Sequence, residues 1–316
     1  MRVVAALLAV ALLVAGANGC GGGDAEPGAP VGATLVLDFT PNAVHSGIYA
    51  AKAEGYYGDA GIDLAIRQPG ESTDAPKLLE AGRADFAILD VHDLGIARER
   101  GLDLVGVMPV VQRPLAAVIA AESVERPRAL RGRTVGVTGL PSDEAVVDSE
   151  VSADGGDPAK VRRVTIGFNA VSSLAAGKVD AVTGFWNAEA VALRARRLPI
   201  HVFKVDRYGA PPYPELVLAT TETTLSEDPE LVEATVDATR RGYRFATDNP
   251  GKALDDLLAA APGLDREEQA GQLLVLRPDL RPAPFDVPVL REWAAWDLEH
   301  GLLTRPLDVA STFDEP

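Results

Sequence analysis

The sequence contains a single cysteine, Cys20, in 316 residues. One thiol excludes an internal disulfide and a thiolate cluster that could bind a metal. Histidine is scarce as well, and no two of His45, His92, His201 and His300 have the spacing of zinc ligands. Lys and Arg total 30 against 46 Asp and Glu, which gives a formal net charge of -16. This balance argues against nucleic acid or an anionic membrane surface as the partner.

Signatures of common enzyme classes are also missing. The chain has no Gly-x-Ser-x-Gly turn, no Walker phosphate loop and no dinucleotide-binding fingerprint. The glycine-containing loop of residues 136–142 could in principle hold an anion. However, Asp143 and Glu144 follow it directly and would occupy the positive end of the next helix. We therefore expect a protein that is not an enzyme, uses no cofactor or metal, and does not favour a phosphorylated ligand.

The N-terminus carries an apolar run from Val3 to Ala15, which is too short to span a bilayer. Small residues precede Cys20, so we expect a signal peptide over residues 1–19. Cys20 resembles the lipidated cysteine of a bacterial lipobox, although Ala17 stands where leucine is usual. An ordinary secretory peptide is the alternative. Residues 20–32 should form a flexible tether, placing the protein on the extracytoplasmic face of the cell membrane by a lipid anchor.

The remaining chain is long enough for two lobes. Strand-like and helix-like runs alternate through it, which predicts an α/β fold with parallel strands and crossover helices. Strands are expected over residues 34–39, 62–67, 84–89, 104–111, 115–120, 134–137, 161–166, 179–183, 201–203 and 213–221. Helices are expected over residues 46–54, 75–80, 94–100, 143–153, 171–176, 188–197, 229–247, 251–260, 266–276 and 288–298.

An internal repeat supports two similar lobes. Residues 79–87 match residues 174–182 position by position, and each stretch ends a helix at a glycine before entering a strand. A chance likeness at a common type of turn is the alternative. Chain crossings near residues 112–114 and 211–213 would then form a hinge over a ligand cleft. We predict lobe 1 over residues 33–112 plus 218–316 and lobe 2 over residues 113–217, with the final helices returning to brace lobe 1.

Candidate site residues of lobe 1 stand where strands give way to helices. Phe39, Asn42 and His45 lie in such a junction, where the first turn of a helix offers unpaired NH groups. Asp90 and His92 lie at the C-terminal end of another expected strand, the edge at which open α/β sheets bind ligands. Asp90 could instead merely cap the following helix.

The matching edge of lobe 2 carries Trp186, Asn187 and Glu189. A flat aromatic ring beside an amide and a carboxylate suits a small planar heterocycle, with Phe39 or Tyr49 on the opposite face. The alternatives are that Trp186 packs in the core and that Glu189 only interacts with the helix dipole.

These residues resemble a known family. The segment from Leu37 to His45 is similar to the Leu-Asp-Trp-x-Pro-Asn-x-x-His pattern of the ABC-importer components that bind thiamine pyrimidine precursors (ThiY type). The likeness continues through residues 53–57, 61–64, 68–71 and 81–86, and returns at residues 184–189.

The resemblance implies a two-lobed, type II periplasmic-binding-protein-like fold that delivers its ligand to a membrane permease as a monomer. It also implies an aminopyrimidine stacked by Phe39 and Trp186, with edge contacts from Asn42, His45, Asn187 and Glu189. Phe39 replaces the usual tryptophan, and the same fold also binds sulfonates, nitrate and riboflavin. A yeast enzyme of this fold makes the pyrimidine from its own histidine and a vitamin B6 cofactor, so a reacting His45 is the second alternative.

Overall fold

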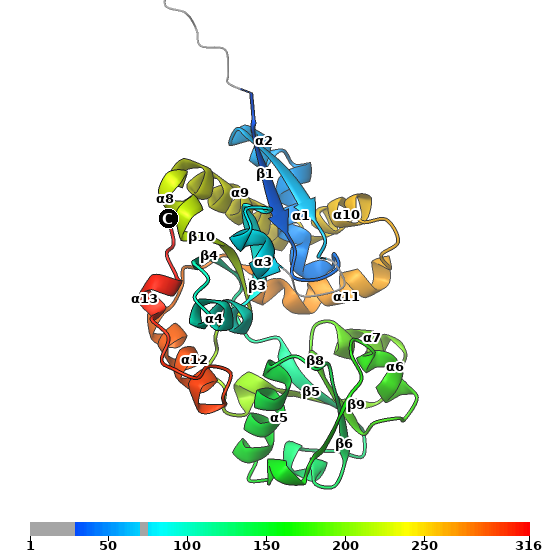
Figure 1. The fold of residues 1–316 in the computed structure, drawn as a ribbon. Coiled ribbons are helices and arrows are strands. Elements are labelled where there is room, and N and C mark those ends of the chain that lie inside the picture. Colours follow the sequence, from blue (N-terminus) through cyan, green and yellow to red (C-terminus); the bar gives the residue numbers. More distant parts are fainter. Residues whose placement is uncertain (1–28, 70–74) are drawn as a thin grey trace, which may run out of the picture.

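The computed structural model describes residues 29–69 and 75–316, and these ranges contain two five-stranded sheets (Figure 1). The predicted signal peptide, Cys20 and residues 20–28 of the predicted tether lie outside the described ranges. Within them, no helix has the length and apolar character needed to cross a bilayer.

The strands are β1 (Val31–Val36), β2 (Ile62–Arg67), β3 (Phe86–Asp90), β4 (Leu104–Val111), β5 (Ala116–Ala121), β6 (Thr134–Val137), β7 (Arg162–Thr165), β8 (Ala181–Phe185), β9 (Ile200–Lys204) and β10 (Leu216–Thr221). The helices are α1 (Ser46–Ala53), α2 (Tyr56–Asp59), α3 (Ala75–Glu80), α4 (Val91–Glu99), α5 (Ser142–Ala153), α6 (Ala170–Ala175), α7 (Glu189–Ala195), α8 (Glu222–Glu227), α9 (Pro229–Asp248), α10 (Pro250–Ala260), α11 (Arg266–Leu276), α12 (Val287–Glu299) and α13 (Val309–Thr312). Short 3-10 turns are η1 (Ala43–His45), η2 (Pro127–Leu130), η3 (Pro158–Lys160), η4 (Val205–Arg207) and η5 (Arg277–Leu280).

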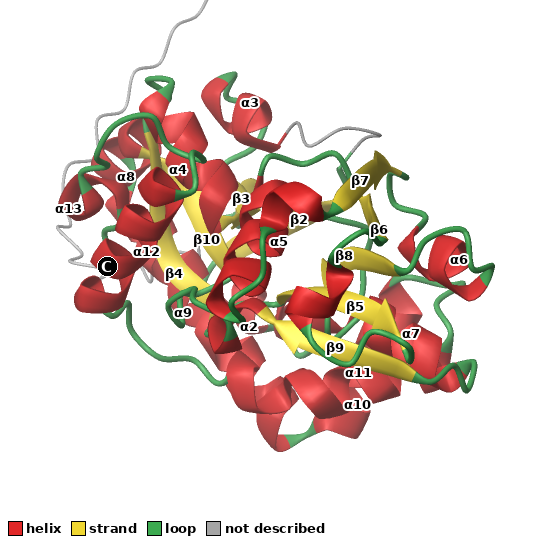
Figure 2. Cartoon of the chain, turned by 90° about the horizontal axis from the view of Figure 1, so that it is seen from below, coloured by secondary structure: helices red, strands yellow, loops and turns green. Residues whose placement is uncertain are grey.

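Each sheet belongs to one lobe. The lobe 1 sheet has the order β2-β1-β3-β10-β4, and the lobe 2 sheet has the order β7-β6-β8-β5-β9. Helices cover both sides of these strands, as the view from below shows (Figure 2). β1 begins at Val31 and β10 at Leu216, so the lobe 1 sheet extends two residues beyond the predicted lobe limits at residues 33 and 218.

The prediction of purely parallel sheets is wrong at β5 and β10. β10 runs antiparallel to β3 and β4, and β5 runs antiparallel to β8 and β9. These two strands directly follow the chain crossings, so each enters its sheet from the edge at which its neighbours end. Leu216, the first residue of β10, accordingly pairs with the last residues of β3 and β4.

Buried polar contacts join the two crossings. The carboxylate of Glu215 accepts a hydrogen bond from the backbone NH of Leu115 at 2.6 Å, and the carbonyl of Glu215 accepts one from Val91 at 3.0 Å. Glu215 is 1% exposed. The two chain crossings of the hinge are therefore held to each other and to the start of α4.

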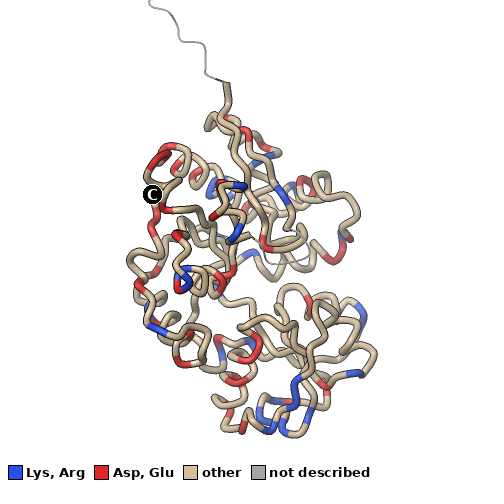
Figure 3. The backbone as a smooth tube through the Cα atoms, in the orientation of Figure 1, with Lys and Arg blue, Asp and Glu red and all other residues tan. Residues whose placement is uncertain are grey.

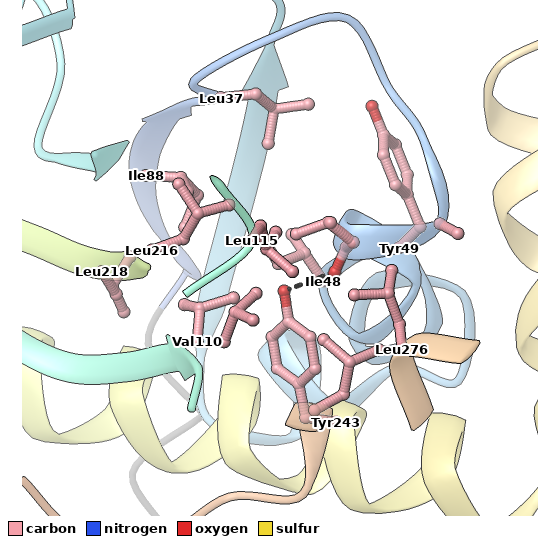
Figure 4. Close-up of a cluster of buried hydrophobic side chains, with 14 of the residues drawn as sticks. Leu37, Ile48, Tyr49, Ile88, Val110, Leu115, Leu216, Leu218, Tyr243 and Leu276 are labelled. Atoms are coloured by element: carbon pink, nitrogen blue, oxygen red, sulfur yellow. Dashed lines mark hydrogen bonds between the residues drawn. The ribbon is translucent and has the colours of Figure 1, made fainter. Parts of the chain in front are cut away.

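Helix α9 holds α1 in place beside the sheet of lobe 1. Asp228 caps α9 by accepting a hydrogen bond from Leu231 NH, and the following apolar residues turn inward. Tyr243 of α9 packs in the core, and its hydroxyl donates a hydrogen bond to the Val44 carbonyl at 3.0 Å (Figure 4). The start of α1, which follows the candidate site segment, is fixed from below by this contact.

From the sequence we expect the C-terminal helices to brace lobe 1. In the structure they also contact lobe 2. α11 contacts both η1 of lobe 1 and α7 of lobe 2. α12 reaches α5 of lobe 2, where the indole NH of Trp296 donates to Ser149 Oγ at 3.4 Å. Two helices from the end of the chain therefore touch both lobes.

Candidate functional site

A pocket of about 390 Å³ lies between the two lobes, within the range usual for a small organic ligand. Its walls come from the ends of β1 and β3 in lobe 1, from the loops after β6 and β8 in lobe 2, and from α11. The described residues that line it are Asp38 to Asn42, Val44, Pro69, Ala75, Pro76, Ile88 to Asp90, Asp93, Thr138, Leu140, Phe168, Val171, Gly184, Phe185, Asn187 to Glu189, Ala192, Leu264, Glu268, Gln269, Gln272 and Leu216.

His45 does not line the pocket, and its neighbour Asp38 does. The His45 ring is fully buried, and its Nε2 lies 2.7 Å from Asp38 Oδ1. Its Nδ1 accepts the backbone NH of Asn42 at 3.2 Å, so the ring proton is on Nε2 and is donated to Asp38. The direct ligand contact predicted for His45 does not fit this placement. His45 instead positions the carboxylate of Asp38. Asp38 is not among the site residues predicted from the sequence.

Asn42 lines the pocket and also shapes the loop. Its side-chain oxygen accepts the NH of Val44 at 2.9 Å, and its amide nitrogen donates to the Thr40 carbonyl at 3.1 Å. β1 ends at Val36 and not at the predicted Phe39, and the asparagine cap starts η1 at Ala43.

Phe39 faces another phenylalanine across the pocket. Its ring centroid lies 5.5 Å from that of Phe168, which belongs to lobe 2, and the planes are tilted by 52°. The two side chains are 43% and 63% exposed. Phe168 stands in an irregular segment without a recognisable pattern, so sequence reasoning missed it; its signal would have been a bare aromatic residue in a polar loop.

Asp90 lines the pocket and also caps α4, accepting the NH of His92 at 2.8 Å; its contact with a ligand stays a prediction. His92 of α4 does not reach the pocket. Its Nδ1 lies 2.8 Å from Asp297 Oδ1, and its Nε2 lies 3.1 Å from the Tyr213 hydroxyl. Burial lowers the pKa of His92, but Asp297, Asp90 and Glu215 together raise that pKa to about 10. His92 does not line the pocket, so its predicted ligand contact does not fit; it ties α4 to α12 and the hinge.

The lobe 2 wall includes Asn187 and Glu189 but not Trp186. The Trp186 indole is 6% exposed, donates to the Pro114 carbonyl at 2.9 Å, and is covered by Lys204 Nζ at 3.3 Å from the ring centre. Its predicted stacking on a ligand does not fit this placement, and the core-packing alternative describes it better. Asn187 is 1% exposed, and its Oδ1 has no partner.

Glu189 lines the pocket and also begins α7, so the predicted dipole partner faces the pocket, while its contact with a ligand stays a prediction. It stands in the first turn of α7, and its Oε2 accepts the backbone NH of Phe185 at 2.8 Å. Burial raises the pKa of Glu189.

In the loop after β6, a carboxylate of the chain itself occupies three donors that could otherwise bind an anion. Asp143 Oδ2 accepts the NH groups of Gly139 at 2.7 Å and Leu140 at 2.9 Å, and the Thr138 hydroxyl at 2.8 Å. The chain's own carboxylate thus fills the cradle, as Asp143 in the helix's first turn led us to expect.

Helix α11 supplies three lining residues that sequence reasoning missed: Glu268, Gln269 and Gln272. Their signal was present in the sequence. Gln269 and Gln272 are three residues apart, so they share one face of the helix, and Leu273 and Leu276 continue that buried face. Polar amides on the buried face of a helix indicate a ligand-binding site. The prediction that α11 only braces lobe 1 is therefore incomplete.

Five carboxylates line the pocket: Asp38, Asp90, Asp93, Glu189 and Glu268. Burial raises the pKa of Asp90 and of Asp93. No Lys or Arg of the described residues lines the pocket. Figure 3 shows that many of the Lys and Arg positions of lobe 2 lie at its end remote from lobe 1. The pocket therefore presents carboxyl groups without a cationic side chain of the described residues beside them. In the described part of the chain, no group of three or more potential ligands is arranged to hold a metal ion.

Comparison with known proteins gives related sequences and folds. Residues 42–253 match the family model described as "NMT1/THI5 like". The formylaminopyrimidine-binding protein of Halalkalibacterium halodurans is 33% identical over 291 residues, with 88% of each chain covered. The 4-amino-5-hydroxymethyl-2-methylpyrimidine phosphate synthase of Legionella pneumophila is 26% identical over 236 residues, covering 73% of this chain and 74% of the relative.

Among solved structures, the periplasmic aliphatic sulphonate binding protein SsuA of Escherichia coli has a TM-score of 0.74 at 14% identity. The match covers 91% of this chain and 93% of that one. At this identity the likeness shows the fold alone. The predicted fold class, an α/β two-lobed type II periplasmic-binding-protein fold, is confirmed.

Proposed function

The chain belongs to the NMT1/THI5-like family, and we propose that it is an extracytoplasmic solute-binding protein that serves an ABC importer. Its lobes close on a small heterocycle, and a membrane permease binds the closed conformation. The ligand class is the aminopyrimidine precursors of thiamine. The relative from Halalkalibacterium halodurans, which is named for binding formylaminopyrimidine, supports this class.

The observation that carries the proposal is the chemistry of the pocket. Five carboxyl groups line it with no Lys or Arg of the described residues beside them, and apolar side chains such as Phe39, Phe168 and Ile88 fill the space between them. An aminopyrimidine has the complementary form, because its ring is flat and apolar on both faces while amino groups donate at the edge. Asp38, Asn42, Asp90, Asn187 and Glu189 are the polar contacts we propose, with Phe39 and Phe168 against the ring.

The location of the protein follows from its N-terminus. We propose that residues 1–19 direct secretion and that Cys20 carries the lipid anchor. The tether would then let a monomeric binding domain meet the permease at the membrane.

The same fold with another solute is the first alternative. A sulfonate or nitrate needs cationic or NH donors, and carboxylates line this pocket instead while Asp143 occupies the NH groups of the loop after β6. These features favour a donor-rich ligand over an anion.

An enzyme with a reacting His45 is the second alternative, and the family includes synthases such as the relative from Legionella pneumophila. His45 is fully buried, and both of its ring nitrogens already have partners in Asp38 and Asn42. A histidine that positions a carboxylate favours binding over chemistry at this residue. We therefore propose that the chain does not act as an enzyme.

A thermal-shift panel tests the proposal, because a ligand that binds only the folded state raises the melting temperature. The panel contains formylaminopyrimidine, the parent aminopyrimidine, riboflavin, taurine and nitrate. We expect the two aminopyrimidines to raise the melting temperature and taurine and nitrate to have no effect. A shift with riboflavin alone would replace the ligand class but keep a solute-binding protein. Shifts with taurine or nitrate, and none with the aminopyrimidines, would overturn the proposal.

A further inference from the structure

Helix α11 places two buried amides against the pocket from outside both sheets. Gln269 is 5% exposed and Gln272 is 3% exposed, and both line the pocket. The Oε1 atom of each is buried without a hydrogen-bond partner. Buried side-chain oxygens are normally paired, so two such atoms on one helix face point to a ligand that pairs them.

The orientation of Gln272 is fixed by its neighbour. Gln272 Nε2 donates to Glu268 Oε1 at 3.2 Å. A carboxylate oxygen only accepts, so the nitrogen end of the amide must face Glu268, and the oxygen end must face away from it. Gln272 therefore offers an acceptor, while one of its two N–H donors is engaged by Glu268.

Lobe 2 contributes acceptors from the opposite side of the same region. α7 contacts α11, and Glu189 of α7 lines the pocket. Burial raises the pKa of Glu189, and the negative charge of Glu268, which lines the same pocket, raises that pKa further. Asn187 adds a third buried oxygen without a partner. No lysine or arginine of residues 29–69 and 75–316 lines the pocket to balance this end.

We propose that the α7–α11 end of the pocket is a subsite for an N–H-bearing substituent of the ligand, in which Gln269 Oε1 and Gln272 Oε1 accept its hydrogen bonds. The inference rests on the proposed function and adds to it a specificity determinant on helix α11. The subsite takes an amine or amide arm attached to the ring. It rejects an apolar arm, because that arm leaves the buried oxygens unpaired.

Two ligands that differ in one group test the subsite by calorimetry. One is 4-amino-5-aminomethyl-2-methylpyrimidine, and the other is 4-amino-2,5-dimethylpyrimidine, which lacks the amine. We expect the wild type to prefer the aminomethyl ligand by roughly tenfold or more. The double variant Gln269→Leu/Gln272→Leu should lose most of that preference, while its affinity for the dimethyl ligand stays within about threefold of the wild type.

Leu274→Gln is the matched control, since Leu274 is 73% exposed on the same helix. It should keep the preference of the wild type. If the leucine variant does not fold, Gln269→Met/Gln272→Met repeats the comparison with side chains of similar length. A wild type that binds neither ligand contradicts the proposed function as well. A wild type that binds both ligands equally, or a folded double variant that keeps the preference, overturns the subsite alone.

Discussion

Glu150 is a carboxyl group that the fold buries completely, in helix α5 of lobe 2 and away from the pocket. Its Oε1 accepts the NH of Val118 at 3.2 Å, and its Oε2 has no partner. Burial raises the pKa of Glu150 well above its ordinary value of 4.5, and the Val118 hydrogen bond offsets this only in part. A group whose pKa is raised by folding stabilises the protein fully below its ordinary pKa. That contribution is lost as the pH rises through the pKa of the folded state.

The variant Glu150→Gln should therefore be more stable than the wild type at pH 8, by about 1 kcal/mol or more, and this advantage should shrink toward pH 4.5. Denaturant unfolding at a series of pH values measures the difference. Ser152→Ala, at an exposed position of the same helix without a titratable group, is the control, and its effect should not vary with pH. An advantage that is constant or grows toward low pH would contradict the expectation.

At the residue scale, the sequence led to the right segments but not to the right atoms. The Asn42 and His45 spacing correctly marked a strand-to-helix junction at the site. Whether His45 or Asp38 faces the ligand depends on how α1 packs on α9, which no local pattern contains. Trp186 was chosen because tryptophan is rare, yet its ring is taken up by Pro114 and Lys204, which are distant in sequence.

At the scale of elements, α1 and α9 cross at unusually close range. A Cβ atom on Gly242 would lie 2.1 Å from the carbonyl oxygen of Gly47. A Cβ atom on Gly47 would lie 2.4 Å from the ring of Tyr243. Both distances are shorter than real Cβ contacts. The close packing of α1 on α9 therefore requires glycine at both positions. This crossing supports η1 and therefore the Asp38 side of the pocket.

Gly242→Ala should destabilise the protein by about 2 kcal/mol or more, despite the higher helix propensity of alanine, because the backbone of α1 must move. Gly251→Ala in α10 is the matched control, since its Cβ would meet open space. That change should be neutral or stabilising by up to about 1 kcal/mol. Thermal unfolding of both variants decides, and equal melting temperatures would show that the crossing can relax.

The boundaries of some elements were predictable from the sequence, but those of β1 were not, since it ends at Val36 and not at Phe39. β2, β4, β6, α3 and α11 begin and end at the predicted residues, because apolar periodicity, caps and glycines all act locally. Strand direction at β5 and β10 was not predictable from the same pattern. It depends on the chain crossing between lobes, and the alternation of strands and helices looks alike in either direction.

At the scale of the whole molecule, Phe39 and Phe168 are an apolar contact between the lobes at the pocket. Both rings remain largely exposed, so they add little to the stability of either lobe. Their contact instead favours the arrangement in which the lobes approach each other. The two-lobed plan was predicted from the repeat at residues 79–87 and 174–182, but the residues that meet across the lobes were not, because they share no local pattern.

Phe168→Ala should raise the dissociation constant for the aminopyrimidine by roughly threefold to tenfold, the range expected for an aromatic pair. The loss should appear as faster dissociation in stopped-flow measurements, while the melting temperature without ligand stays the same. Val164→Ala, at an exposed apolar position on β7, is the control. It should leave the dissociation rate unchanged. Unaltered dissociation from the Phe168 variant would show that the pair does not hold the closed arrangement.

The position of β10 has a consequence for how the protein assembles. This strand comes last along the chain, yet it lies between β3 and β4 inside the lobe 1 sheet. Until residues 216–221 have been added, those two strands have no common partner, and each leaves an open edge that could pair with another chain. Lobe 2, in contrast, is one uninterrupted stretch of sequence and can form alone. Lobe 1 therefore closes only after lobe 2 has been made, and nascent chains that stop before Leu216 carry the greatest risk of aggregation.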